Sequence, residues 1–177
     1  MPDNTDPVPG IGDPNADIMF VGEALGENEA IQERPFVGVA GQLLTKMLKE
    51  VGITREECYI TNVVHCRPTT NGGKKNRAPT EEEITACKGW LWKEMQTVKP
   101  KIIVTLGKVP TYTLLHSKLK KTFKMGAVAG NVYDVDYIDS HFIPCWHPSY
   151  LLQHGKDKIE ETKDILKLAK GMVDELQ

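Results

Sequence analysis

Short apolar runs that alternate with helical segments constrain the fold of this chain most. Four runs rich in β-branched or aromatic residues each have the length of one buried strand: ADIMFVG, CYITNVVHC, PKIIVTLG and FIPCW. Segments with apolar residues at helical spacing lie between and after them, at 40–52, 81–98, around Pro110 and at 156–177. This alternation predicts an α/β fold, a three-layer α/β/α sandwich around a mainly parallel sheet.

The length of 177 residues and an apolar content of 40% predict one domain over 1–177, with a Pro/Gly/Asp-rich leader at 1–15. A net charge of −2 gives no global basic field, so nucleic-acid binding needs a local patch. No run approaches the roughly 20 apolar residues of a membrane span, and the first residues do not resemble a signal peptide. We therefore expect a cytoplasmic protein with no membrane partner, and its four scattered cysteines fit reduced thiols.

The carboxyl ends of the expected strands are where an open parallel sheet binds its ligand. They carry Gly22 with Glu23, Asn62, Gly107 and His147. Taken alone, Asn62 is more often a turn-capping amide, and a lone histidine is structural about as often as it is functional. Both readings stay open at this point.

The turn after the first strand, FVGEALGENEA, combines two glycines with three carboxylates. It matches neither the phosphate-binding GxxxxGK[ST] loop nor the dinucleotide fingerprint GxGxxG, which argues against a nucleotide-binding hydrolase. Pairs of the types HxxH, HExxH and CxxC are also missing from the sequence, so a catalytic zinc has no evident ligands.

The segment from Arg67 to Arg77 is a polar, Gly- and Pro-rich loop that also contains Lys74 and Lys75. A solvated surface loop is the simplest interpretation. Contacts with a phosphate backbone are the alternative, because they would explain why the positive charge is concentrated there.

Five motifs in register resemble the uracil-DNA glycosylase superfamily, most closely its family 4: FVGEALG, RPFVGVAGQLL, TNVVHCRP followed by NRAP, IIVTLG and WHPSYLL. The likeness extends from about Val8 to Leu152. It implies a central four-stranded parallel sheet flanked by helices, and a pocket at the strand ends that receives uracil flipped out of DNA.

The resemblance also implies roles for individual residues. Phe36 corresponds to the aromatic residue that stacks on the flipped base, and Asn62 to the amide that reads the base edge; Gly22 and Ser149 belong to the same substrate-binding motifs. An amide that donates to uracil O4 and accepts from N3–H is left unpaired by cytosine. The DNA-binding residues are expected to be Lys74, Lys75, Arg77, Tyr150 and Leu151.

Cleavage of the N-glycosidic bond produces a uracil anion and a cationic sugar, so a donor at uracil O2 stabilises charge as it develops. His147 is our candidate for that donor. Glu23 and Glu29 are candidates for stabilising the sugar or orienting the water, and the sequence does not divide these two roles between them.

Two departures from family 4 stand out. Leu25 occupies the position of the family's proline, which removes a fixed φ from the turn, and Ala30 that of its second acid. Family 4 also holds a [4Fe–4S] cluster with four cysteines, of which this chain matches only Cys66 and Cys87. We therefore expect no cofactor, unless the missing ligands come from outside this chain.

The sequence thus predicts a monofunctional DNA glycosylase, a hydrolase of N-glycosyl bonds that acts on uracil-containing DNA in base excision repair, and we expect a monomer. The alternative is a glycosylase-like DNA-binding domain with weak or no catalysis, fused to or associated with replication proteins.

Overall fold

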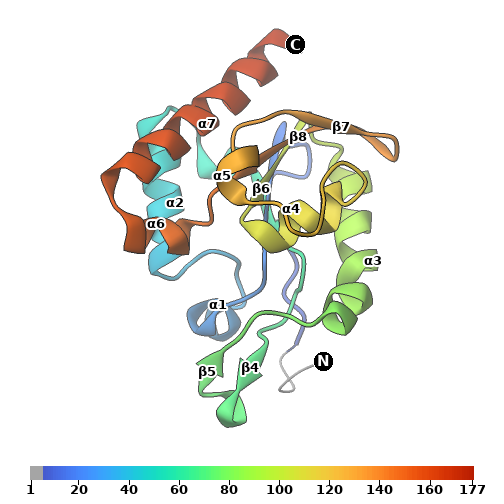
Figure 1. The fold of residues 1–177 in the computed structure, drawn as a ribbon, viewed down its shortest axis with the longest axis vertical. Helices are drawn as coiled ribbons and strands as arrows, with labels where there is room; N and C mark the ends of the chain where they lie inside the picture. The colour runs from blue at the N-terminus through green and yellow to red at the C-terminus, as the bar shows by residue number, and fades with distance from the viewer. Residues whose placement is uncertain (1–5) are drawn as a thin grey trace.

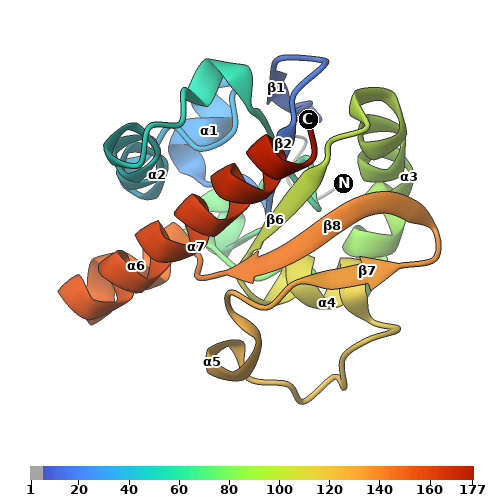
Figure 2. The same ribbon diagram turned by 90° about the horizontal axis from the view of Figure 1, so that it is seen from above.

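A computed structural model describes residues 6–177 of the chain, and a six-stranded sheet forms its centre (Figures 1 and 2). The strand order is β1-β3-β2-β6-β8-β7. The four inner strands are mutually parallel, and they are β3 (Tyr59–Asn62), β2 (Ile18–Gly22), β6 (Ile102–Leu106) and β8 (Ile138–Cys145). These inner strands contain residues from all four apolar runs, so the mainly parallel sheet is confirmed.

The expected count of four strands is wrong, because the sheet has an antiparallel strand at each edge. These are β1 (Ile11–Gly12), paired with β3, and β7 (Tyr133–Val135), paired with β8. Both are short, and β1 is exposed, so neither produces an apolar run in the sequence. Backbone pairing with an existing sheet edge is what makes them strands.

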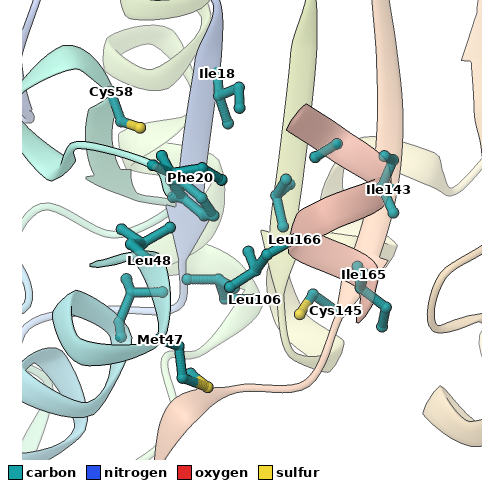
Figure 3. Close-up of a cluster of buried hydrophobic side chains, with 14 of the residues drawn as sticks. Ile18, Phe20, Met47, Leu48, Cys58, Leu106, Ile143, Cys145, Ile165 and Leu166 are labelled. Carbon is teal, nitrogen blue, oxygen red and sulfur yellow. The ribbon is translucent and has the colours of Figure 1, made fainter. Parts of the chain in front are cut away.

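Helices cover both faces of the sheet, as the three-layer prediction requires (Figure 2). On one face lie α2 (Val39–Glu50), α6 (Pro148–His154) and α7 (Lys156–Glu175), and on the other α3 (Glu81–Val98) and α4 (Lys108–Leu115). Because side chains alternate along a strand, Phe20 joins the first core and Met19 the second. Figure 3 shows the first core, where Phe20, Leu48, Leu106 and Leu166 meet.

Short elements complete the described chain. They are the helices α1 (Glu27–Gln32) and α5 (Met125–Val128), the 3₁₀ turns at Arg55–Glu57 and Asn71–Gly73, and the hairpin of β4 (Thr69–Thr70) with β5 (Lys75–Asn76). A capping box begins α3: the hydroxyl of Thr80 accepts from the Glu83 amide at 3.2 Å, and Glu83 accepts from the Thr80 amide at 2.9 Å.

The expected leader, 1–15, lies partly outside the described residues, because the structure describes it only from Asp6 onward. In the described part, Val8 is buried and its amide donates to the carbonyl of His65 at 2.7 Å. The same stretch contains β1, so it belongs to the folded unit. Among the described residues, no helix has both the length and the apolar character needed to cross a membrane.

Candidate active site

A cavity of about 650 Å³ opens at the carboxyl ends of the inner strands. Its lining comes from the turn after β2, the start of α2, the end of β3, the residues after β5 and the start of α6. Among the lining residues are Glu23, Glu29, Phe36, Asn62, Arg77, His147 and Ser149. Segments more than 120 residues apart in the sequence therefore meet at the edge of the sheet where the strand ends predicted a ligand site.

Gly22, the last residue of β2, lets an aromatic ring and an amide approach each other. A Cβ atom on Gly22 would lie 2.4 Å from Cζ of Phe36 and 2.5 Å from Oδ1 of Asn62, closer than real contacts allow. Phe36 is only 6% exposed, and its ring lies 5.9 Å from the His147 ring, at an interplanar angle of 35°. The ring and the amide thus form adjacent parts of one cavity wall.

Asn62 closes β3 and is 3% exposed. Its Oδ1 is buried and accepts no hydrogen bond from any described residue. An unsatisfied buried acceptor destabilises a fold by about 1–3 kcal/mol, so such groups call for an explanation. A ligand that offers an N–H group to this oxygen would satisfy it.

His147 caps the amino end of α6, and the extended backbone before Pro148 fixes its direction. Its Nδ1 accepts from the amide of Ser149 at 3.0 Å and lies 2.7 Å from the Ser149 hydroxyl. Because a backbone amide only donates, Nδ1 carries no proton. Burial lowers the pKa of His147 to about 4, against the opposing charge of Glu29, so at neutral pH the ring is uncharged with its one proton on Nε2.

The two candidate carboxylates have different surroundings. Glu29 accepts from the amides of Gly26 at 3.1 Å, Val37 at 2.9 Å and Gly38, so it holds the backbone of two turns together. Glu23 lines the cavity, and among the described residues its carboxylate has no hydrogen-bond partner. Burial raises the pKa of Glu23, while Glu27 lies exposed at the rim.

Comparison with known proteins gives consistent matches. The model of the uracil DNA glycosylase superfamily matches residues 9–170. A type-4 uracil-DNA glycosylase of Sulfurisphaera tokodaii is 45% identical over 93% of this chain and 76% of its own length, and that of Thermotoga maritima is 40% identical over 92% and 84%. The chain belongs to the uracil-DNA glycosylase superfamily.

One further relative of this chain is a much longer protein. A DNA polymerase of Bacillus phage SP01 is 32% identical over 94% of this chain, but the match covers only 17% of the polymerase. A segment similar to this chain therefore occurs within a much longer DNA polymerase.

The basic loop from Arg67 to Arg77 contains the β4–β5 hairpin, which projects beyond the sheet beside α1 (Figure 1). Lys74 and Lys75 are exposed on it. The two arginines instead brace the hairpin: Arg77 pairs with Glu83 at 2.6 Å, and Arg67 donates to Asn76 at 2.7 Å. The pairing with Arg77 lowers the pKa of Glu83 to about 2. Of the three DNA contacts expected in this loop, Lys74 and Lys75 are thus exposed, whereas Arg77 lies in the cavity wall and supports the hairpin.

Leu151, which was expected to bind DNA, is buried. Leu151 is 1% exposed and belongs to the core beneath α6, whereas Leu152 is 50% exposed. The faces of the Tyr150 ring are also covered, because it stacks on Trp146 at 4.8 Å and on His154 at 3.8 Å between ring centroids.

The cysteines do not form a four-thiolate site within residues 6–177. Cys66 and Cys87 are buried in the core on the α3 side, and burial raises the pKa of Cys66 to about 11. Cys58 and Cys145 lie in the core on the opposite face of the sheet. No group of three or more metal-binding side chains occurs in the described part of the chain. These residues therefore do not fit the family's [4Fe–4S] cluster.

The turn with Leu25 in place of proline is anchored in another way. The Leu25 side chain is 3% exposed, and its amide, which proline would lack, donates a long hydrogen bond of 3.4 Å to the carbonyl of Cys66. Sequence reasoning also missed Asn76 in the cavity wall and Arg55 behind it. Asn76 is the first residue of the NRAP motif, which could have identified it, whereas Arg55 lies in none of the quoted motifs and only its contacts identify it.

Proposed function

We propose that this chain is a monofunctional DNA glycosylase that accepts uracil flipped out of DNA and hydrolyses its N-glycosidic bond, as the first step of base excision repair. The observation that carries the proposal is the buried, unpaired Oδ1 of Asn62 beside the Phe36 ring and the Nε2–H of His147, all in one cavity. The type-4 uracil-DNA glycosylases that resemble the chain over most of its length support it.

Recognition of uracil follows from the donor and acceptor pattern of its edge. Oδ1 of Asn62 accepts from uracil N3–H, and its Nδ2 donates to O4, while Phe36 stacks on the base and Ser149 holds the donor histidine in position. Cytosine has no N3–H and carries an amino group in place of O4, so it would leave the Asn62 amide unsatisfied.

For catalysis we assign the donor role to His147. As the bond between C1′ and N1 breaks, the electron pair stays on uracil, and the Nε2–H of neutral His147 stabilises the negative charge at O2. Water then adds to C1′, and the proton that it loses neutralises the uracil anion. We assign Glu23 to orient that water, because its carboxylate faces the cavity without a partner, whereas Glu29 is held by backbone amides.

A second function, that of a DNA-binding module with little catalysis inside a replication assembly, is favoured by one observation only. That observation is the match to a short part of a phage DNA polymerase. A replication partner is therefore part of the second proposal, while the first needs only DNA. For the glycosylase we also propose a monomer that works in the cytoplasm.

The deciding experiment uses an end-labelled oligonucleotide with a single uracil, a matched one with cytosine in its place, and alkali after incubation with excess protein. We expect strand scission at uracil only. Scission at neither base would favour the DNA-binding module, and scission at both would contradict the assignment of Asn62 as the reader of the base.

A further inference from the structure

The loop that carries Phe36 has a backbone conformation that does not persist without support. Phe36 has a φ of 53°, in the left-handed region that bulky residues rarely adopt. Such a conformation is strained and is stable only where surrounding contacts enforce it. The contacts around residues 35–38 therefore decide where the ring lies.

One side of this loop is held through its amides. The carboxylate of Glu29, in α1, accepts from the amides of Val37 and Gly38, the two residues directly after Phe36. These hydrogen bonds fix the backbone just before α2, but they make no contact with the Pro35 carbonyl that precedes Phe36.

Arg55 holds the loop through its carbonyls, from the 3₁₀ turn between α2 and β3. Its Nη2 donates to the carbonyl of Pro35 at 2.9 Å, and its Nη1 donates to the hydroxyl of Thr45 at 2.6 Å and to the carbonyl of Gly41 at 3.4 Å. Thr45 donates to the same Gly41 carbonyl at 3.1 Å. One planar guanidinium thus ties the peptide before Phe36 to the first turns of α2.

The packing behind the ring leaves little freedom for another arrangement. A Cβ atom on Gly41 would lie 2.1 Å from the carbonyl carbon and oxygen of Phe36, so α2 packs directly against the peptide that follows Phe36. In front, the ring touches Gly22 and lies beside His147. A shift of the 35–36 peptide would therefore move the ring relative to both Asn62 and His147.

We propose that Arg55 is a positioning residue for the flipped base, which acts by clamping the Pro35 carbonyl so that the Phe36 ring stays aligned with Asn62 and His147. This inference rests on the proposed glycosylase function. Arg55 does not line the cavity, so its effect passes through Phe36 rather than through contact with substrate. Misplacement of a reacting group by about 1 Å can slow catalysis about 10²-fold, which sets the scale of the effect.

The first test compares single-turnover uracil excision by Arg55→Lys and Arg55→Gln with that of Arg34→Lys. Arg34 precedes the same loop and is exposed, so this matched change controls for the loss of any guanidinium near the loop. We expect both Arg55 variants to be about 10- to 100-fold slower and Arg34→Lys to be unchanged. Arg55 variants that cleave at the wild-type rate would overturn the proposal.

A double-mutant cycle separates positioning from general destabilisation. If Arg55 acts through the Phe36 ring, then Arg55→Lys should slow Phe36→Ala by less than about twofold, because the ring it positions is already absent. The full 10- to 100-fold loss in the Phe36→Ala background would overturn the proposal. Thermal unfolding of each variant identifies a global loss of fold, and Arg55→Lys, which keeps the charge, serves as the milder change if Arg55→Gln does not fold.

A spectroscopic measurement keeps the inference testable even if the wild-type protein fails to excise uracil and the proposed function is wrong. The chain has four phenylalanines, so ring ¹³C labelling gives a simple spectrum in which Phe36→Ala assigns the Phe36 signals. We expect Arg55→Lys to shift the Phe36 signals and leave those of Phe20, Phe123 and Phe142 in place. Unshifted Phe36 signals would overturn the clamp independently of activity.

Discussion

At the scale of single residues, a hydrogen bond and burial together determine the protonation state of His147. The Ser149 amide requires an unprotonated Nδ1, and burial lowers the pKa of the ring to about 4. The outcome is a neutral ring with a donor on Nε2 over the ordinary range of pH. A donor of this kind stabilises a departing anion without transferring a proton to it.

His147→Ala should lower the single-turnover excision rate by about 10²–10³, the range found when one oxyanion donor is removed. Affinity for uracil-containing DNA should change little, because the contact strengthens mainly in the transition state. Rapid-quench kinetics and a binding titration measure the two quantities separately. Wild-type cleavage by the variant would remove His147 from the mechanism.

Glu23 should determine how excision responds to acid. Burial raises the pKa of Glu23, and the proposed water-orienting form is the carboxylate, so the rate should fall as pH falls through a value above 4.5. His147 gains its proton only at a pKa of about 4, after that loss has begun. In a pH–rate profile, Glu23→Gln should be slow and should lack this acidic limb. An unchanged limb in Glu23→Gln would assign it to another group.

At the scale of elements, the β4–β5 hairpin separates two uses of positive charge. Arg67 donates to Asn76 and Gly73 within the hairpin, and Arg77 donates to Glu83 of α3, which ties the projecting element to the fold. Lys74 and Lys75 are exposed, and neither takes part in these hydrogen bonds. The hairpin therefore presents two lysines from a braced platform next to the cavity, where the phosphates that flank a flipped nucleotide would pass.

Lys74→Gln with Lys75→Gln should weaken binding to any DNA sequence and flatten its salt dependence. Each lost phosphate contact reduces the slope of log K against log salt by about 0.9 on duplex DNA. The control is Lys49→Gln with Lys99→Gln, which removes the same charge from exposed helix ends near the amino ends of the strands. Equal slopes in the two double variants would make the hairpin an ordinary solvated loop.

At the scale of the whole molecule, the sheet keeps the cysteines apart. Two lie in each core, and the sheet between them prevents all four thiolates from reaching one cluster. Cys66 and Cys87 are buried on the α3 side in one apolar cluster with Leu91 and Met95.

Purified protein should accordingly contain less than about one iron per chain and lack the broad absorbance near about 400 nm that iron–sulfur proteins show. Metal analysis and an absorption spectrum of anaerobically purified protein measure this. Stoichiometric iron and sulfide would contradict it, and Cys66→Ala and Cys87→Ala would then show whether these thiolates are ligands.

The sequence by itself determined the fold class and the places where chemistry gathers. Buried parallel strands need continuous apolar runs, and their carboxyl ends carry Gly22, Asn62 and His147, so both features are visible in one dimension. The edge strands β1 and β7 were not visible, because backbone pairing, which has no side-chain signature, creates them.

Only the tertiary structure decided which side of α6 faces the core. Leu151 and Leu152 are equally apolar, but successive helical residues point about 100° apart, and packing against α2 and α7 buries the first and exposes the second. Arg55 is the same kind of case, since it lies 20 residues from the Pro35 carbonyl that it holds. Local pattern cannot encode such contacts, because they exist only once the helices and the sheet have packed together.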